Sequence, residues 1–166
     1  NPLLYPSVLR NLEWINEKDH FSFIFNNRLV KANSFTSNMD TILTLTELNA
    51  KIQKYLKKSD VEISDLKTFP NIKWIDDNTF VCVAENVLLK YEFAPTKNNI
   101  LDYIPKDDKV SVVNTFNKNA KNIDYDINSL LVAYTVENQL FIAKNNTQIN
   151  LANESNSNIL FGQAVH

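Results

Sequence analysis

Glycine is almost missing from this sequence: Gly162 is the only one in 166 residues, against about 7% in an average protein. Phosphate-binding loops use several glycines to bring the backbone close to the phosphate groups. A Walker loop and a dinucleotide-binding fingerprint are therefore excluded, and so is the Gly-x-Ser-x-Gly turn of a serine hydrolase. Turns that need a positive φ must use another residue, and asparagine, which is abundant here, is the next most tolerant.

Cysteine, basic charge and long apolar runs are also scarce. The single cysteine, Cys82, excludes a disulfide within the chain and a metal site built from cysteines. A net charge of −2 and a pI of about 5.7 give no basic surface for nucleic acid. No apolar run approaches the roughly 18 residues of a transmembrane helix. We therefore expect neither a nucleic-acid partner nor a membrane span.

The sequence does contain a repeat in three copies. Each copy opens with asparagine, an aliphatic residue, a charged residue and an aromatic residue: NLEWI from Asn11, NIKWI from Asn71 and NIDYD from Asn122. A polar turn, an apolar run, a two-residue polar break and a second apolar run then follow. The opening asparagine lies 16, 15 and 16 residues before the asparagine of the polar break. These later asparagines are Asn27, Asn86 and Asn138.

Each repeat has the pattern of a β-meander, since its short runs of β-branched and aromatic residues are separated by asparagine turns. We expect the three hairpin asparagines to adopt the positive φ of a type I′ turn. The middle strand of the second repeat is apolar on both faces, with Phe80, Cys82 and Ala84 on one and Val81 and Val83 on the other. Such a strand is covered on both sides. A fourth strand is expected in each repeat, at 41–45, 99–104 and 158–162.

Four antiparallel strands per repeat, with the sheets stacked face to face, form the blades of a β-propeller. We therefore predict an all-β fold, a partial β-propeller of about three four-stranded antiparallel blades. The blades are expected at about 9–45, 69–104 and 119–162, all within one fragment of an N-terminal propeller domain.

An amphipathic segment separates the first two blades. In residues 46–58, Leu48, Ile52 and Leu56 recur at helical spacing with lysines opposite. This pattern predicts a short inserted helix with Thr46 as its N-cap.

The acidic and histidine residues form no catalytic pattern. The adjacent pairs Asp76–Asp77 and Asp107–Asp108 are predicted to be turn residues. Asp124 and Asp126 share a strand face, where solvent or a turn hydrogen bond is the expected partner. His20 has no second ligand nearby in sequence, and His166 is the last residue.

The remaining candidates suggest packing. Cys82 lies inside an apolar strand and is predicted to be buried. Trp14 and Trp74 hold equivalent repeat positions, which favours packing between blades over a ligand cage. We therefore name no catalytic, substrate-binding or metal-binding residue and expect no cofactor.

Longer stretches resemble a known family. TLTELNAKIQKY at 44–55, LKTFPNIKWIDDNTFVCVAENVLLKYEF at 66–93, AYTVENQLFIA at 133–143 and the terminal GQAVH carry the likeness. They resemble the N-terminal β-propeller region of dipeptidyl peptidase IV proteins of Bacteroidetes-type bacteria, in the prolyl oligopeptidase clan. The resemblance spans the chain and is most specific at 44–93 and 121–166.

The resemblance implies a role within a larger serine exopeptidase that removes N-terminal dipeptides. Its propeller covers an α/β-hydrolase domain, which carries the catalytic triad and has no counterpart in this sequence. The expected partners are that domain of the same parent chain and the parent's peptide substrates. The segment itself is expected to be inactive, serving as scaffold and substrate gate. Family members are exported, which implies a periplasmic or cell-surface location.

Two features bear on how much of that family's site is present. The resemblance places the family's amine-binding acids just beyond His166, and neither Arg10 nor Arg28 matches its substrate-binding arginine. The chain starts at Asn1 without a signal peptide, which indicates a processed start or a segment of a longer chain.

Open sheet edges predict self-association of the segment. The alternative function is a stand-alone propeller-like module that binds protein or glycan without enzymatic activity.

Overall fold

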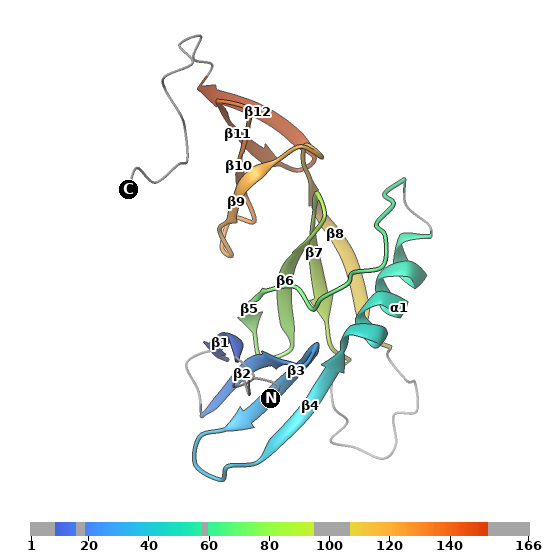
Figure 1. Ribbon diagram of the computed structural model, residues 1–166, viewed down its shortest axis with the longest axis vertical. Helices are drawn as coiled ribbons and strands as arrows, with labels where there is room; N and C mark the ends of the chain where they lie inside the picture. Colours follow the sequence, from blue (N-terminus) through green and yellow to red (C-terminus); the bar gives the residue numbers. More distant parts are fainter. Residues whose placement is uncertain (1–8, 16–18, 58–59, 95–106, 153–166) are drawn as a thin grey trace, which may run out of the picture.

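The computed structural model describes residues 9–15, 19–57, 60–94 and 107–152. This part of the chain forms twelve β-strands and one α-helix. The strands form three four-stranded antiparallel sheets, each a meander in which strands consecutive in sequence are paired (Figure 1). The predicted all-β architecture of three four-stranded units with a short helix is therefore confirmed.

The three sheets follow one another along the chain. Sheet 1 contains β1 (Arg10–Trp14), β2 (His20–Phe25), β3 (Arg28–Asn33) and β4 (Met39–Thr44). Sheet 2 contains β5 (Ile72–Asp76), β6 (Thr79–Ala84), β7 (Val87–Glu92) and β8 (Lys109–Thr115). Sheet 3 contains β9 (Lys121–Tyr125), β10 (Val132–Val136), β11 (Gln139–Lys144) and β12 (Thr147–Ala152).

The fourth strands were predicted correctly in sheet 1 alone. There β4 covers most of the expected 41–45, whereas the expected 99–104 and 158–162 lie outside the described residues. The fourth strands of sheets 2 and 3 are instead β8 and β12. Neither strand is a long apolar run: Ser111 and Asn114 interrupt the valines of β8, and five of the six residues of β12 are exposed.

The hairpin turns use a positive φ, as the lack of glycine requires. Asn27 has the expected conformation, with φ of 57°. In the other two predicted hairpins the positive φ lies one residue earlier, at Glu85 and Glu137, both at 53°. The prediction was therefore right about the turns but wrong about Asn86 and Asn138.

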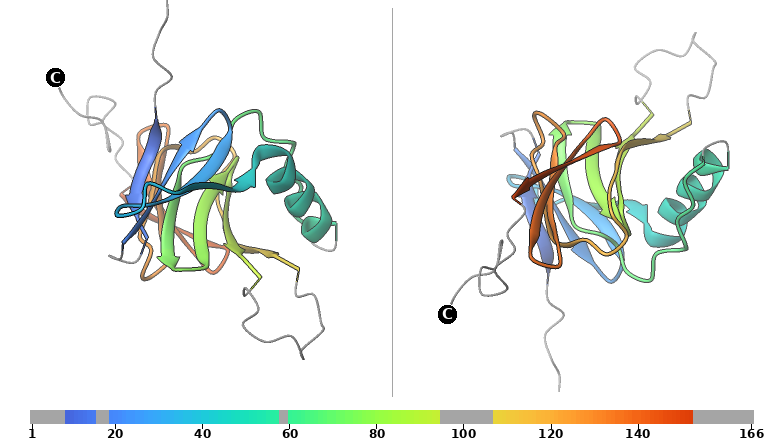
Figure 2. Two further views of the ribbon diagram at one scale, coloured as in Figure 1. Left: turned by 90° about the horizontal axis from the view of Figure 1, so that it is seen from below. Right: turned by 90° about the horizontal axis from the view of Figure 1, so that it is seen from above.

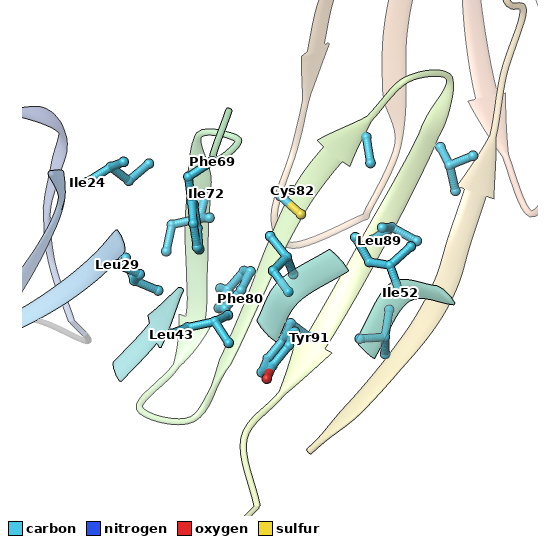
Figure 3. Close-up of a cluster of buried hydrophobic side chains, with 14 of the residues drawn as sticks. Ile24, Leu29, Leu43, Ile52, Phe69, Ile72, Phe80, Cys82, Leu89 and Tyr91 are labelled. Atoms are coloured by element: carbon cyan, nitrogen blue, oxygen red, sulfur yellow. The ribbon is translucent and has the colours of Figure 1, made fainter. Parts of the chain in front are cut away.

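The sheets stack face to face along the long axis of the molecule (Figures 1 and 2). The larger core lies between sheets 1 and 2 and includes Phe80, Cys82 and Ala84 of β6 (Figure 3). Val81 and Val83, on the opposite face of β6, pack in the second core with sheet 3. Sheet 2 is therefore covered on both sides, as its apolar middle strand predicted.

The helix α1 (Leu45–Leu56) begins directly at the end of β4. Its N-cap is Thr44 rather than the predicted Thr46, because Thr44 and Glu47 form a capping box. The Glu47 backbone N–H donates to Thr44 Oγ1 at 3.2 Å, and the Thr44 N–H donates to Glu47 Oε2 at 2.8 Å. Within the described residues no helix is long and apolar enough to cross a membrane.

The apolar face of α1 packs on the sheets. Leu48, Ile52 and Leu56 are buried in the core between sheets 1 and 2. The helix contacts both β4 and β8 and lies to one side of the stack, beside these last strands (Figure 2). It therefore continues from the end of β4 and lies against β8.

The face of sheet 1 that points away from sheet 2 is also apolar. Phe23, Val30 and Ala32 form a small cluster there, alternating with Ile24 and Leu29, which face sheet 2. We call this surface the sheet 1 outer face.

Candidate functional site

The first strands of the three sheets carry a row of charges. Glu13 of β1, Lys73 of β5 and Asp124 of β9 occupy the same position of the repeat. Their signs alternate, so neighbouring sheets present opposite charges to one another. We call these three residues the charged row.

Lys73 joins sheet 2 to sheet 3. Its Nζ lies 3.1 Å from Asp124 Oδ1, donates to the Tyr125 carbonyl oxygen at 2.9 Å and stands 4.4 Å from the centre of the Tyr125 ring. The hydrogen bond from Lys73 and that from the Tyr125 backbone N–H lower the pKa of Asp124. The Asp124 side chain is 82% exposed, so the ion pair alone contributes little; the ring and carbonyl contacts fix the ammonium in place.

Glu13 is in a less polar setting. Burial raises its pKa, an effect opposed by a hydrogen bond from Asn11 and the charge of Lys73. The Asn11 Nδ2 group donates to Glu13 Oε1 and to the Ile72 carbonyl oxygen, both at 3.0 Å. The Ile72 backbone N–H in turn donates to Asn11 Oδ1. The Asn11 side chain thus pairs with β5 as a neighbouring strand would, and connects sheets 1 and 2.

The segment leading into β5 is held by two further side chains of sheet 1. Asn27 Oδ1 accepts from the Phe69 N–H at 3.0 Å, and an Arg10 Nη2 group donates to the Phe69 carbonyl oxygen at 3.1 Å. Arg10 therefore forms a structural contact between sheets 1 and 2.

The seam between sheets 2 and 3 has its own asparagine pair. Asn114 Nδ2 donates to the Ala143 carbonyl oxygen at 2.9 Å, and Asn114 Oδ1 accepts from the Asn146 N–H at 2.9 Å. Asn146 Oδ1 accepts from the Thr115 N–H at 2.9 Å. These contacts were not predicted, because neither asparagine belongs to the repeated pattern.

The two tryptophans, equivalent in sequence, are not equivalent in the structure. Trp74 is buried between sheets 1 and 2, and its indole Nε1 donates to Ser22 Oγ at 2.7 Å. Trp14 is 60% exposed and meets Phe21 of its own sheet edge-on. The predicted packing between blades is therefore right for Trp74 and wrong for Trp14, because Trp14 lies on the sheet 1 outer face, where the described residues place no further sheet.

The first acidic pair and Asp126 have the predicted turn roles. Asp76 Oδ1 accepts from the Asn78 N–H at 2.8 Å. Asp126 Oδ2 accepts from the Ser129 N–H at 2.7 Å and from its hydroxyl at 2.6 Å. These hydrogen bonds lower the pKa of Asp126.

The second acidic pair connects elements, which corrects its predicted turn role. Asp107 forms ion pairs with Lys51 and Lys54 of α1, and their hydrogen bonds lower its pKa to about 2. Asp108 accepts from the Tyr91 hydroxyl at 2.6 Å and from the Ala94 N–H at 2.8 Å. Sequence spacing could not reveal these partners, because Asp107 lies more than 50 residues from both lysines.

The histidine and the cysteine that the structure describes lie on strands, His20 on β2 and Cys82 on β6. The Nε2 atom of His20 lies 3.2 Å from the amide nitrogen of Asn33. Cys82 is 1% exposed, and burial raises its pKa to about 12. No group of three or more His, Cys, Asp or Glu side chains in the described ranges is placed to hold a metal ion. His166 lies outside these ranges.

One groove of about 550 Å³ lies beside the C-terminal end of α1. It is lined by charges of both signs, including Lys57, Glu62, Glu85 and Lys118. Glu85 already accepts from the Ser64 N–H at 3.0 Å. Glu85 therefore holds the segment that leads from α1 towards β5.

Neither a family model nor a curated protein matches this chain. A solved structure does: a candidate dipeptidyl aminopeptidase IV from Bacteroides ovatus, 19% identical, with a TM-score of 0.63 over 91% of this chain. The two share a fold. At the level of the fold, this confirms the resemblance predicted from the sequence. The chain spans 18% of the length of the Bacteroides protein.

Proposed function

We propose that the chain forms three neighbouring blades of the β-propeller of a dipeptidyl peptidase IV-like serine exopeptidase, in which it acts as scaffold and substrate gate. The observation that carries the proposal is the fold shared with a candidate dipeptidyl aminopeptidase IV over 91% of the chain. Catalysis is assigned to a hydrolase domain elsewhere in the parent protein, and no residue of this chain is assigned a chemical step.

The arrangement of the sheets supports a place in a ring. The first strands are joined directly across neighbouring sheets, by Asn11 to Ile72 and by Lys73 to Asp124. The last strands β4 and β8 are instead both in contact with the intervening helix α1. Blades that surround an axis have this property: they are close at their inner strands and separated at the rim.

The sheet 1 outer face supports the presence of a further blade. It carries a buried aliphatic and aromatic cluster next to exposed Trp14 and Met39, which are 60% and 62% exposed. Another sheet placed there would cover these side chains as sheet 2 covers the opposite face. In the isolated chain, we expect this face to drive weak self-association, and a strict monomer in sedimentation at high concentration would contradict that expectation.

The charged row gives the gate its chemistry. In a ring the first strands line the central passage, so the proposal places Glu13, Lys73 and Asp124 along the path of a peptide. Alternating charges attract neither cationic nor anionic peptides as a class. This suits an exopeptidase that acts on peptides of varied sequence.

Peptidase assays of the parent protein test the assignment. The full-length product of the gene should release dipeptide from a Gly-Pro chromogenic substrate, and a serine-reactive phosphonate should abolish that turnover. The chain 1–166 alone should show none. A parent without this activity would exclude the exopeptidase assignment and favour the binding module.

A second measurement separates the gate from the scaffold. In the active parent, Lys73→Met should change KM for long peptides more than KM for the chromogenic dipeptide, because only long peptides extend into the passage. Lys90→Met is the matched control, since Lys90 is on β7 and pairs with Glu92 of its own strand. Equal effects of both substitutions on both substrates would exclude the proposed role as substrate gate and leave only the role as scaffold.

A further inference from the structure

Strand β12 is the outer edge of sheet 3, and the described residues place no strand on its free side. The helix α1 contacts the corresponding outer strands of sheets 1 and 2, β4 and β8. In β12, Ile149 is 48% exposed and Leu151 is 54% exposed. Two apolar side chains are thus exposed on this outer strand.

The composition of β12 makes this edge unusual. Its sequence, TQINLA, has no charged residue and no proline. Proteins commonly protect exposed edges with such residues, lysine above all, because unpaired backbone groups recruit another strand. The other five edge strands each carry at least one charge: Arg10 and Glu13, Asp40, Lys73 and Asp76, Lys109, and Lys121 and Asp124.

The register of the hairpin determines which backbone groups of β12 are free to pair with another strand. The strands β11 and β12 are joined by a two-residue turn, with Lys144 opposite Thr147 and Ile142 opposite Ile149. Residues next to a two-residue turn form a hydrogen-bonded pair, and such pairs alternate along an antiparallel ladder. The N–H and C=O groups of Gln148 and Asn150 therefore point to the free side.

An antiparallel copy of β12 satisfies these groups. With a two-fold axis at Ile149, Gln148 of one copy pairs with Asn150 of the other, and the two Ile149 side chains lie opposite each other. No like charges meet, because the strand has none. We propose that β12 is a self-pairing edge through which two copies of this chain form an eight-stranded sheet. The inference goes beyond the proposed function, because closure of a propeller ring leaves its outer strands accessible.

Site-specific crosslinking tests this register. In it, the Cα atoms of the two Ile149 residues lie about 4.5 Å apart, as in any non-hydrogen-bonded pair, so Ile149→Cys should form an intermolecular disulfide under mild oxidation. The matched control is Thr147→Cys, whose two copies lie four residues apart along the strand, about 13 Å, and should not crosslink. The native Cys82 is buried and does not compete. Equal crosslinking of both variants, or no crosslinking of the Ile149→Cys variant, would overturn the proposal.

Charge substitution tests the same pairing in solution. Ile149→Lys and Ile149→Glu should each raise the dimer dissociation constant by about tenfold or more, because like charges face each other. A mixture of the two should restore the dimer as a heterodimer, seen by sedimentation equilibrium. Ile149→Thr is the uncharged control and should retain the dimer. Circular dichroism verifies that each variant is folded. A native chain that is strictly monomeric would also refute the proposed pairing of two β12 strands.

Discussion

The indole N–H of Trp74 and the hydroxyl of Ser22 form a buried hydrogen bond of 2.7 Å between sheets 2 and 1. Ser22 is fully buried and Trp74 is 7% exposed, so neither group has access to water as an alternative partner. The bond therefore fixes how the two sheets face each other, in addition to the apolar contacts around it.

Removal of the hydroxyl should be costly. Ser22→Ala leaves the Trp74 N–H buried without its acceptor, and we expect a loss of about 1–3 kcal/mol in the free energy of unfolding. Urea denaturation followed by tryptophan fluorescence measures this loss. In a double-mutant cycle with Trp74→Phe, the two losses should sum to more than that of the double variant. Strict additivity would show that the bond contributes nothing.

The two tryptophans should differ in their contribution to stability. Trp74→Ala creates a cavity between sheets and should cost about 3–5 kcal/mol. Trp14→Ala, at a site that is 60% exposed, should cost under about 1 kcal/mol. Both values come from the same denaturation experiment at low protein concentration. Similar losses would mean that the sheet 1 outer face is covered in the free chain.

The ion pairs of Asp107 with Lys51 and Lys54 connect the start of β8 to α1, and their contribution to stability should fall in acid. The pKa of Asp107 is lowered to about 2 by Lys51 and Lys54, below its unfolded value of about 3.9. Its contribution is therefore present above about pH 4 and is lost as the pH falls towards about 2. The stability difference between the native chain and Asp107→Asn should shrink over this interval, as measured by urea denaturation.

A control for this titration is the variant with both lysines replaced, Lys51→Met and Lys54→Met. In that background Asp107→Asn should have the same small effect at every pH. High salt should also reduce the native difference, because these side chains are solvent-accessible. A difference that is independent of pH in the native background would contradict the ion pairs.

The thiol of Cys82 should be silent in the folded protein. Burial raises its pKa to about 12, and only the thiolate reacts with disulfide reagents. At pH 8 the native chain should not react with Ellman's reagent, whereas the chain in urea should release one equivalent. Equal rates in the two conditions would show that sheets 1 and 2 separate readily.

The repeat predicted most of the fold because it determines local pairing. An alternation of turn residues and apolar runs specifies hairpins, and a strand apolar on both faces requires a sheet on each side. Cys82 and Val81 therefore took their predicted places on opposite faces of β6. The shared charge position of the repeat also contained the signal for the charged row, since opposite signs occur at equivalent residues of adjacent sheets.

Other features depend on partners that are remote in sequence. Trp14 and Trp74 have the same local sequence pattern. Their burial differs because a neighbouring sheet covers only Trp74. Asp107 is next to a second aspartate, as turn residues often are, yet its lysines come from a helix more than 50 residues earlier. The polar strand β12 was missed because an outer strand needs no apolar run to join a sheet.

Ten of the described residues other than glycine have a positive φ. For residues with a Cβ this conformation costs roughly 1–2 kcal/mol, and asparagine is among the few that adopt it routinely. At Glu85, Glu137 and Leu130, with φ of 53–55°, most replacements would keep that strain, and β-branched residues would increase it. Exposed turns are ordinarily where a protein tolerates mutation best. In this one, the positive-φ positions should reject β-branched residues and gain stability from glycine or asparagine.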